Sequence, residues 1–562
     1  MIVFFSALPR SDGQQSLDEL LNAARDLSGR ADYARAIPLL KRAIALDPQN
    51  ADANSMLGVA YFQSGHPADA LGPLRLAIAT DPGNMTTRGY LGDTEMELKD
   101  FAAASEAFEA AVASSNGSEQ SLMWWTDFAL ERYRDLQFAL RGSPSGRAEL
   151  MIVSAEEPTL DVKTKQSLLS QAAALNPRAD RIWGELGVAQ IELSSRSDAE
   201  SSLKQALAVA PHAVSTLKLQ CLLSVASGNW NEAGEQLAEI EQRSHTEFEQ
   251  LLDSWPHPLI PRPGVTGAIW DCLRSRSTDC PLATQLSTPQ NSASAQDLYA
   301  EGRWETLLTS PRPATNNPSY SFWRGVAFAE TGDCLRAIPL LERGLEPGAA
   351  VAAARLTNCY RAQALGAADR LGSQGKLASL HKIRGDILLS IRLDPAGAET
   401  EYRIALGLKP KDPEVLERLA EAYFSEGKLS EAKQAAEEAQ NLNPHRSQLL
   451  RLLIRIAMNE RDYPAALTLL AQLSEVLSQN SWAQVQQAKA YSQTDRPADA
   501  AKDLKAALDA GYPDPKGGLH ALLAAQLRKL GRTEEARRAS ETAIKLADAY
   551  QQQAQPAPED QP

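Results

Sequence analysis

The side chains best suited to metal binding or acid–base catalysis are scattered along this chain. It has seven histidines, and no two of them stand at the spacing of a helical zinc site such as His-Glu-x-x-His. Gly375 and Lys376 lack the upstream glycine of a phosphate-binding P-loop, because residue 370 is arginine. The stretch 142–146 has proline at its third position, where a nucleophile elbow has serine. The sequence therefore predicts no catalytic residue, no metal site and no cofactor.

The cysteines give a second possible chemistry, which depends on the compartment. The five cysteines are Cys221, Cys272, Cys280, Cys334 and Cys359, and none forms a Cys-x-x-Cys pair. Zinc-ribbon and thioredoxin-type sites are therefore excluded. Cys272 and Cys280 could bridge a short loop if the protein is exported, or they are isolated thiols. The odd count argues against a complete disulfide framework.

Composition restricts the class of protein further. The chain has 562 residues, of which 43% are hydrophobic and 23% charged, so it folds. Its net charge of -14 does not provide the basic surface that nucleic acid needs, and we expect no nucleic-acid partner. No segment reaches the roughly 18 uninterrupted apolar residues of a membrane-spanning helix. Residues 1–16 begin with a short apolar run, which is either a disordered N-terminus or the tail of a signal sequence that starts upstream.

Self-similarity at a period of 34 residues organises most of the chain. Prolines recur at this distance, as in Pro48 and Pro82 or Pro410 and Pro444. Eleven frames align when the proline is placed at position 32: 17–50, 51–84, 85–118, 180–213, 214–247, 318–351, 379–412, 413–446, 447–480, 481–514 and 517–550.

Position 20 of the repeat is alanine in all eleven frames. The alanines are Ala36, Ala70, Ala104, Ala199, Ala233, Ala337, Ala398, Ala432, Ala466, Ala500 and Ala536. Position 8 is mostly small, as at Gly58 and Gly92, and position 24 is often large, as at Leu74 and Phe108. This pattern predicts two helices that cross closely, with a large side chain on one filling a groove on the other.

The turn between the two predicted helices has its own pattern. Position 15 is often glycine, which permits a left-handed backbone, and an aromatic residue or leucine often stands at position 17. We expect one helix over about positions 2–14 and a second over about 18–30. Together these features resemble the tetratricopeptide repeat. The resemblance implies an all-α, right-handed solenoid of stacked helix-turn-helix units. Because no catalytic motif accompanies the repeats, we expect no enzymatic activity. Cys221, Cys334 and Cys359 then fall at packing positions, and we expect all three to be buried thiols.

The repeats divide the chain into two predicted arrays. The N-terminal array covers 17–247 and contains an enlarged, atypical repeat at 119–179, with a long helix over 121–140, a loop at 142–146 and a closing helix over 167–175. A proline-rich connector with one decayed repeat covers 248–317. The C-terminal array covers 318–550 and includes a helical extension without a clean frame at 352–378, and residues 551–562 form a disordered tail.

The family resemblance also implies where a partner would bind. In tetratricopeptide proteins, positions 2, 5, 9 and 12 line a concave groove. Transferred to the C-terminal array, these positions give acidic, then basic residues with apolar anchors, which suits an extended peptide or a partner helix. The predicted partner-binding residues are Glu414, Glu417, Glu421, Phe424, Arg451, Arg455, Met458, Trp482 and Lys489. Neither array has the lysine and asparagine at positions 5 and 9 that hold a terminal carboxylate in chaperone adaptors.

Three functions remain open from the sequence. The first is a protein–protein interaction scaffold that binds a peptide or partner protein in its concave grooves. The second is an exported, periplasmic or outer-surface assembly factor for polymer or pilus export, suggested by the apolar N-terminus and the pair Cys272 and Cys280. The third is an enzyme with catalytic groups in the 248–317 connector, which would need a deep pocket there.

Overall fold

The computed structural model describes residues 16–30, 32–156, 160–179, 181–227, 229–244, 247–248, 251, 298, 304–309, 318–345, 349–443, 447–476 and 481–554. Every regular element in these ranges is a helix, so the all-α prediction is confirmed. The predicted bridge between Cys272 and Cys280 lies outside them, as do residues 1–15 and nearly all of the connector. No helix in the described part of the chain is long and apolar enough to cross a membrane.

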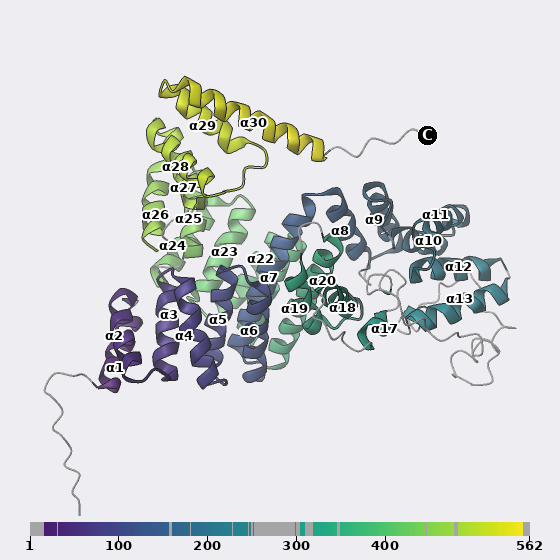
Figure 1. Cartoon of the computed structure of the whole chain (residues 1–562), viewed down its shortest axis with the longest axis horizontal. Coiled ribbons are helices and arrows are strands. Elements are labelled where there is room, and N and C mark those ends of the chain that lie inside the picture. The colour runs from purple at the N-terminus through teal and green to yellow at the C-terminus, as the bar shows by residue number, and fades with distance from the viewer. Residues whose placement is uncertain are drawn as a thin grey trace, which may run out of the picture. The chain divides into compact units, whose positions relative to one another are not determined.

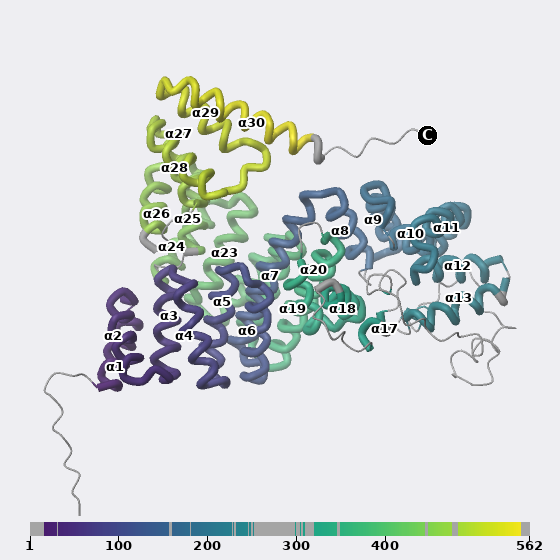
Figure 2. Tube along the Cα trace, viewed as in Figure 1, coloured from purple at the N-terminus to yellow at the C-terminus, as the bar shows by residue number. Residues whose placement is uncertain are grey.

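The repeat frames form successive pairs of antiparallel helices (Figures 1 and 2). The first six are α1 (Leu17–Gly29), α2 (Tyr33–Leu46), α3 (Ala51–Gln63), α4 (Pro67–Thr80), α5 (Met85–Glu97) and α6 (Phe101–Ser114). Four more are α10 (Ile182–Glu192), α11 (Arg196–Val209), α12 (Val214–Ala226) and α13 (Trp230–Arg243). These bounds agree with the two helices expected in each frame.

The later frames follow the same plan after a short helix, α17 (Trp304–Thr309). They comprise α18 (Pro318–Glu330), α19 (Cys334–Gly344), α21 (Leu377–Ile387), η1 (Leu388–Arg392, a π-helical turn), α22 (Pro395–Leu408), α23 (Pro413–Ser425), α24 (Leu429–Leu442), α25 (Ser447–Asn459), α26 (Tyr463–Val476), α27 (Ser481–Gln493), α28 (Pro497–Asp509), α29 (Gly518–Lys529) and α30 (Thr533–Ala554). Because α30 continues to Ala554, residues 551–554 of the predicted disordered tail are helical.

One backbone conformation recurs in the turns of the nine frames whose position 15 the structure describes. Position 15 has a positive φ at Gly65, Lys99, Ser194, Gly332, Leu393, Gly427, Arg461, Asp495 and Gly531. The left-handed conformation therefore belongs to the position, and residues with a side chain adopt it at a cost of about 1–2 kcal/mol. Position 16 then often caps the second helix, as where the Asp100 carboxylate accepts a hydrogen bond from the Ala103 amide at 3.1 Å.

The close helix crossing predicted from the alanine column is present. All eleven alanines are buried, and none is more than 3% exposed. A Cβ placed on Gly58 would lie 2.4 Å from Leu74 Cγ, so positions 8 and 24 are in contact across α3 and α4. Cys221 and Ala233 meet in the same way between α12 and α13, where the cysteine sulfur lies 3.7 Å from the alanine carbonyl oxygen.

Two regions have more helix than one repeat. The enlarged repeat consists of α7 (Glu119–Arg141), α8 (Pro144–Ala155) and α9 (Val162–Leu175), and the extension is the single helix α20 (Ala350–Ser373). The long helix ends at the predicted loop 142–146, but the loop is shorter than expected: only residues 142 and 143 separate α7 from α8, which begins at Pro144. Ser143 caps that helix by accepting a hydrogen bond from the Gly146 amide at 3.0 Å.

The chain divides into two compact units that are not consecutive in sequence. One unit contains Met1–Phe128 and Leu365–Tyr550, and the other contains Ala129–Ala364. Within the first unit the returning chain packs on the end of the N-terminal repeats, where the Gln374 side-chain amide donates to the Gly117 carbonyl at 2.9 Å. The predicted arrays thus describe the order of repeats along the sequence, and the compact units describe which repeats pack together.

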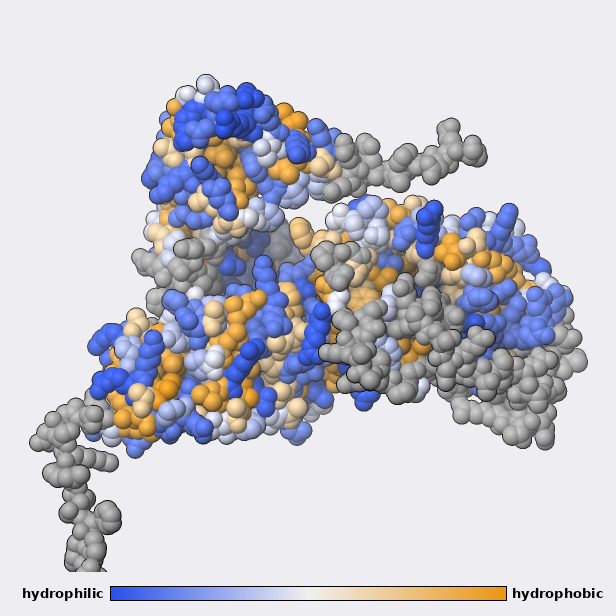
Figure 3. All heavy atoms as spheres, viewed as in Figure 1, coloured by the Kyte–Doolittle hydropathy of each residue, from blue (hydrophilic) through white to orange (hydrophobic). Residues whose placement is uncertain are grey.

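The surface is mixed in character. Over α1–α6, hydrophobic and hydrophilic residues are interspersed on the face seen in Figure 3. Between α1 and α6, the leucines Leu46, Leu76 and Leu98 are 54%, 40% and 38% exposed. Single exposed leucines are ordinary for a folded protein and need no partner to explain them.

The buried alanine column gives a test of this packing. Ala70→Leu should lower the free energy of unfolding by roughly 1–3 kcal/mol, because the added atoms overpack the crossing of α3 and α4. Ala68→Leu is the matched control, since Ala68 is exposed on the same helix, and it should change stability by less than about 0.5 kcal/mol. Urea denaturation of both variants measures the difference, and equal losses would contradict the crossing.

Candidate functional site

The predicted groove residues all lie on the first helices of three consecutive repeats, α23, α25 and α27. Two ring contacts connect neighbouring repeats. The Arg455 guanidinium lies 4.5 Å from the centroid of the Phe424 ring, and the Arg451 guanidinium lies 5.8 Å from that of Trp482. Both distances are within cation–π range. The structure therefore brings together four of the predicted residues as two pairs.

Two of the predicted apolar anchors pack against a buried hydrophobic cluster. Met458 and Trp482 are partly buried against a cluster formed by Leu450, Ile454, Leu470, Leu473 and Ala483. Arg451, Arg455 and Lys489 are exposed. This surface thus has half-buried apolar side chains beside solvent-exposed cations.

The acidic residues predicted for the groove lie differently. Glu417 is only 7% exposed, so it does not present its carboxylate to solvent. Glu414 and Glu421 are half-buried, and Glu421 pairs with Arg418 at 3.2 Å. Among the predicted residues, the exposed charge is therefore positive and comes from α25 and α27.

A buried charge cluster that the sequence pattern did not predict lies in the same unit. The Lys382 ammonium lies 3.1 Å from Asp127 and 3.4 Å from Asp386, and Arg418 lies 3.4 Å from Asp386. Burial opposes the charge on Lys382, but Asp127 and Asp386 outweigh it and raise its pKa. One signal existed in the sequence: Asp386 occupies position 8, where most repeats have a small residue.

Asp127 and Lys382 of this cluster also line a polar hollow of about 740 Å³. Its lining includes Met85, Trp124, Lys376, Lys409 and Glu414. The indole of Trp124 lies over Gly89, where an added Cβ would come within 2.5 Å of the ring. Acidic and basic side chains both line this hollow. None of the described lining residues has a buried polar atom without a hydrogen-bond partner, so the lining indicates no particular ligand.

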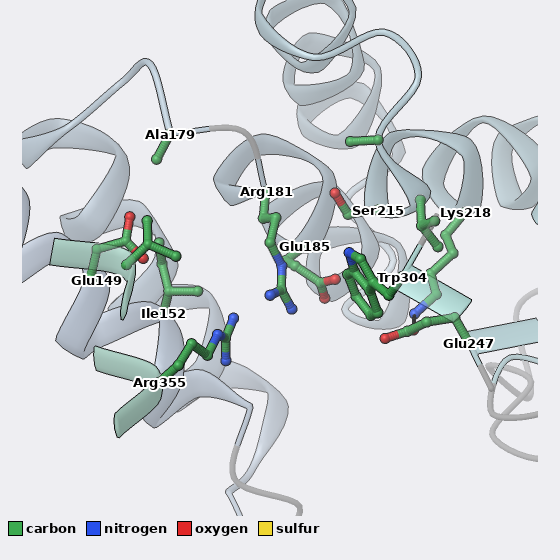
Figure 4. A pocket seen from close by; sticks show the side chains of 13 residues that line it. Glu149, Ile152, Ala179, Arg181, Glu185, Ser215, Lys218, Glu247, Trp304 and Arg355 are labelled. Carbon is green, nitrogen blue, oxygen red and sulfur yellow. Dashed lines mark hydrogen bonds and ion pairs between the residues drawn. The ribbon is translucent and has the colours of Figure 1, made fainter. Parts of the chain in front are cut away.

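The second unit contains a smaller and more highly charged hollow, shown in Figure 4. Two arginines and two glutamates close one side as a ring of ion pairs. Arg181 lies 2.9 Å from Glu156 and 2.6 Å from Glu330, and Arg355 lies 2.5 Å from Glu156 and 2.9 Å from Glu330. Burial opposes ionisation of Glu156, but the two arginines outweigh it and lower its pKa to about 2.

Two further carboxylates line this hollow, and for both of them burial outweighs the attraction of the nearby cations. Burial raises the pKa of Glu149 to about 7, and it raises that of Glu185 as well. Lys218, by contrast, pairs with Glu247 at its edge. The Arg181 guanidinium also lies 5.7 Å from the centroid of the Trp304 ring, so that α17 and α10 meet at this site.

The cysteines differ from the sequence prediction. Cys334 and Cys359 are buried as expected, at 7% and 1% exposure, but they form a disulfide with a Cα–Cα distance of 5.1 Å and are not free thiols. The reason is tertiary: the start of α19 lies against the middle of α20, within the separation that a disulfide requires. Cys221 is a free, buried thiol, as expected, and burial raises its pKa to about 12. No group of three or more potential metal-binding side chains occurs in the described ranges.

Comparisons with known proteins add the family. A family model described as "Tetratricopeptide repeat" matches residues 21–84 and 388–447. No protein of curated function matches the chain. Among solved structures, "MamA 41-end from Desulfovibrio magneticus RS-1" is 16% identical, with 31% of this chain and 96% of that chain covered and a TM-score of 0.29. The structure titled "Crystal structure of APC/C hetero-tetramer Cut9-Hcn1" is 13% identical, covers 95% of this chain and 88% of that chain, and has a TM-score of 0.29.

The raised pKa of Glu149 predicts a pH-dependent stability. Its carboxyl has a higher pKa in the folded protein than in the unfolded chain, so its destabilising effect is absent below about pH 4.5 and grows as pH rises through about 7. Glu149→Gln should therefore raise the free energy of unfolding at about pH 8 by up to about 3 kcal/mol and leave it little changed at about pH 4.5.

Urea denaturation at both pH values measures this effect. Glu235→Gln is the control, because Glu235 is exposed on α13. A gain for Glu149→Gln that is equal at both pH values would show that its charge in the hollow is not the cause.

Proposed function

Because the chain is a tetratricopeptide repeat protein, we propose that it binds an extended segment of a partner protein along α23, α25 and α27. The repeats support a role as a protein–protein interaction scaffold. The family model that matches the chain describes a repeat and is not the model of a catalytic family. The partner segment would bind in the predicted groove, with its side chains meeting those of Phe424, Arg451, Arg455, Met458 and Trp482.

One observation carries this proposal: two exposed arginines are held over aromatic rings on adjacent repeats. A cation stacked on a ring loses little side-chain freedom on binding, because its position is already restricted. Arginine and tryptophan are also the residue types that contribute most to binding at protein interfaces. The two pairs therefore provide a preorganised surface for acidic and apolar side chains.

The exposed charges select the chemistry of the partner. Arg451, Arg455 and Lys489 are exposed, whereas Glu417 is buried and Glu421 is paired. A segment with acidic residues near one or two apolar side chains would complement this surface, since carboxylates bind the guanidinium forks in a bidentate manner. The proposed mechanism is binding of the partner segment without catalysis of a reaction.

The test reverses the groove charge. Arg451→Glu with Arg455→Glu should weaken binding of the recovered partner at least about tenfold, because both stacked cations are lost. The control is Lys502→Glu with Lys505→Glu, which makes the same change in charge at exposed positions of α28. Affinity purification with mass spectrometry identifies the partner, and titration of its purified segment measures the affinity. If both double variants bind as the unaltered protein does, the groove is elsewhere.

A second function is favoured by the disulfide. Disulfides persist in exported proteins and are rare in reducing compartments, and the bond between Cys334 and Cys359 closes a loop of 25 residues. We therefore keep as an alternative that the protein acts outside the cytosol as an assembly factor for exported polymer or pili. This alternative concerns the compartment and the process, and it uses the same binding surface.

Cysteine labelling in intact cells separates the two settings. An exported protein should have Cys334 and Cys359 protected from alkylation unless a reductant is added. Peptide mass spectrometry after alkylation of the native protein measures this, with the buried thiol Cys221 labelled only after unfolding as the internal control. Full labelling of both residues in unfolded but unreduced material would end the exported alternative.

A further inference from the structure

The hollow of the second unit has the features of a built ligand site. It has a volume of about 60 Å³, and one water molecule needs roughly 10–15 Å³ of cavity. It thus holds a ligand about the size of four or five waters. Most of its lining residues belong to α8, α10, α12, α17 and α20 (Figure 4). The ring of arginine–glutamate pairs holds one side in place.

Two buried polar groups at this hollow have no hydrogen-bond partner. They are the indole nitrogen of Trp304 and the hydroxyl of Ser215. Trp304 is 6% exposed and Ser215 5%, and both side chains line the hollow with Glu185 (Figure 4). A buried donor without an acceptor is destabilising, because it has lost its hydrogen bonds to water. The indole N–H therefore calls for an oxygen acceptor in the hollow.

The charges of the hollow call for a cation. Five glutamates line or border it, namely Glu149, Glu156, Glu185, Glu247 and Glu330, against the three cations Arg181, Arg355 and Lys218. The three cations are satisfied by Glu156, Glu330 and Glu247, whereas neither Glu149 nor Glu185 forms an ion pair with any described residue. An anionic ligand would have to displace existing pairs, and a cationic ligand would not.

We propose that this hollow binds a primary ammonium group that has an oxygen acceptor on the adjacent carbon unit, as in a free amino acid or the N-terminal residue of a peptide. The ammonium would be held by Glu185, which lies on the same side of the hollow as Trp304 and Ser215 (Figure 4), and the oxygen would accept hydrogen bonds from the Trp304 indole and the Ser215 hydroxyl. The raised pKa of Glu185 agrees with this arrangement, since an incoming cation favours the ionised carboxylate. The site is separate from the groove and does not depend on it.

The experiment uses the full chain and four small probes at about pH 8, where Glu149 is ionised. Glycine represents a free amino acid, and glycinamide represents the first residue of a peptide. N-acetylglycinamide lacks the ammonium, and acetate has only the carboxylate. Calorimetric titration should show saturable binding of glycine, glycinamide or both, with N-acetylglycinamide and acetate at least about tenfold weaker. Preference for glycine indicates a free amino acid, and equal or better binding of glycinamide indicates a peptide N-terminus.

Variants of the lining assign the contacts. Trp304→Phe should weaken binding roughly five- to tenfold through loss of one N–H donor, and Glu185→Gln at least about tenfold through loss of the charge. Trp183→Phe is the matched control, because it removes an indole N–H that donates to the Pro177 carbonyl outside the hollow. Thermal unfolding shows that each variant folds.

Three results would overturn the proposal. The first is no saturable binding of glycine or glycinamide below about 10 mM. The second is equal binding of N-acetylglycinamide, which would remove the ammonium from the recognition. The third is a Trp304→Phe variant that is folded and binds as the unaltered protein does.

Discussion

The structure depends on one steric constraint, the room for a single methyl group where the two helices of each repeat cross. A buried alanine at position 20 permits the backbones to approach, and a small residue at position 8 receives the larger side chain from position 24, as Gly58 receives Leu74. Each helix pair can then bury its apolar face only against the neighbouring pairs. The stacked arrangement, and the open faces of the first helices, follow from this repeated contact.

Charge is placed by a different rule. Adjacent repeats share continuous apolar cores, whereas the places where the returning chain packs within each unit contain buried ion pairs. Asp127 with Lys382 in one unit and Glu156 with Arg355 in the other join residues that are more than a hundred positions apart. Buried pairs of this kind contribute little net stability, because desolvation offsets the attraction. We interpret them as fixing which repeats pack together, since a mispaired arrangement would leave a buried charge without a partner.

The proposed partner-binding surface and the hollow of the second unit are preorganised in different ways. On the proposed binding surface of α23, α25 and α27, the arginines are stacked on rings and already restricted while their charges stay in water. In the hollow of the second unit the walls are fixed by paired charges, and the groups left over are a donor and two carboxylates. The first arrangement suits a long segment that covers a surface, and the second suits a small group that is enclosed.

The sequence by itself determined the repeat, its period, its two helices, the left-handed turn at position 15 and the buried alanine column. These features are local: they depend on residues within one frame of 34, so the pattern of small, large and turn residues is sufficient. Only the tertiary structure decided that Cys334 and Cys359 form a disulfide, that Glu417 is buried, and that Arg355 meets Glu156. Each of these depends on which repeats lie side by side after the chain returns, and spacing along the chain does not contain that information. Asp386 is an example of what the sequence leaves open. A charged residue at position 8, where most repeats have a small residue, indicates an unusual contact, but the sequence does not identify Lys382 and Arg418 as the partners.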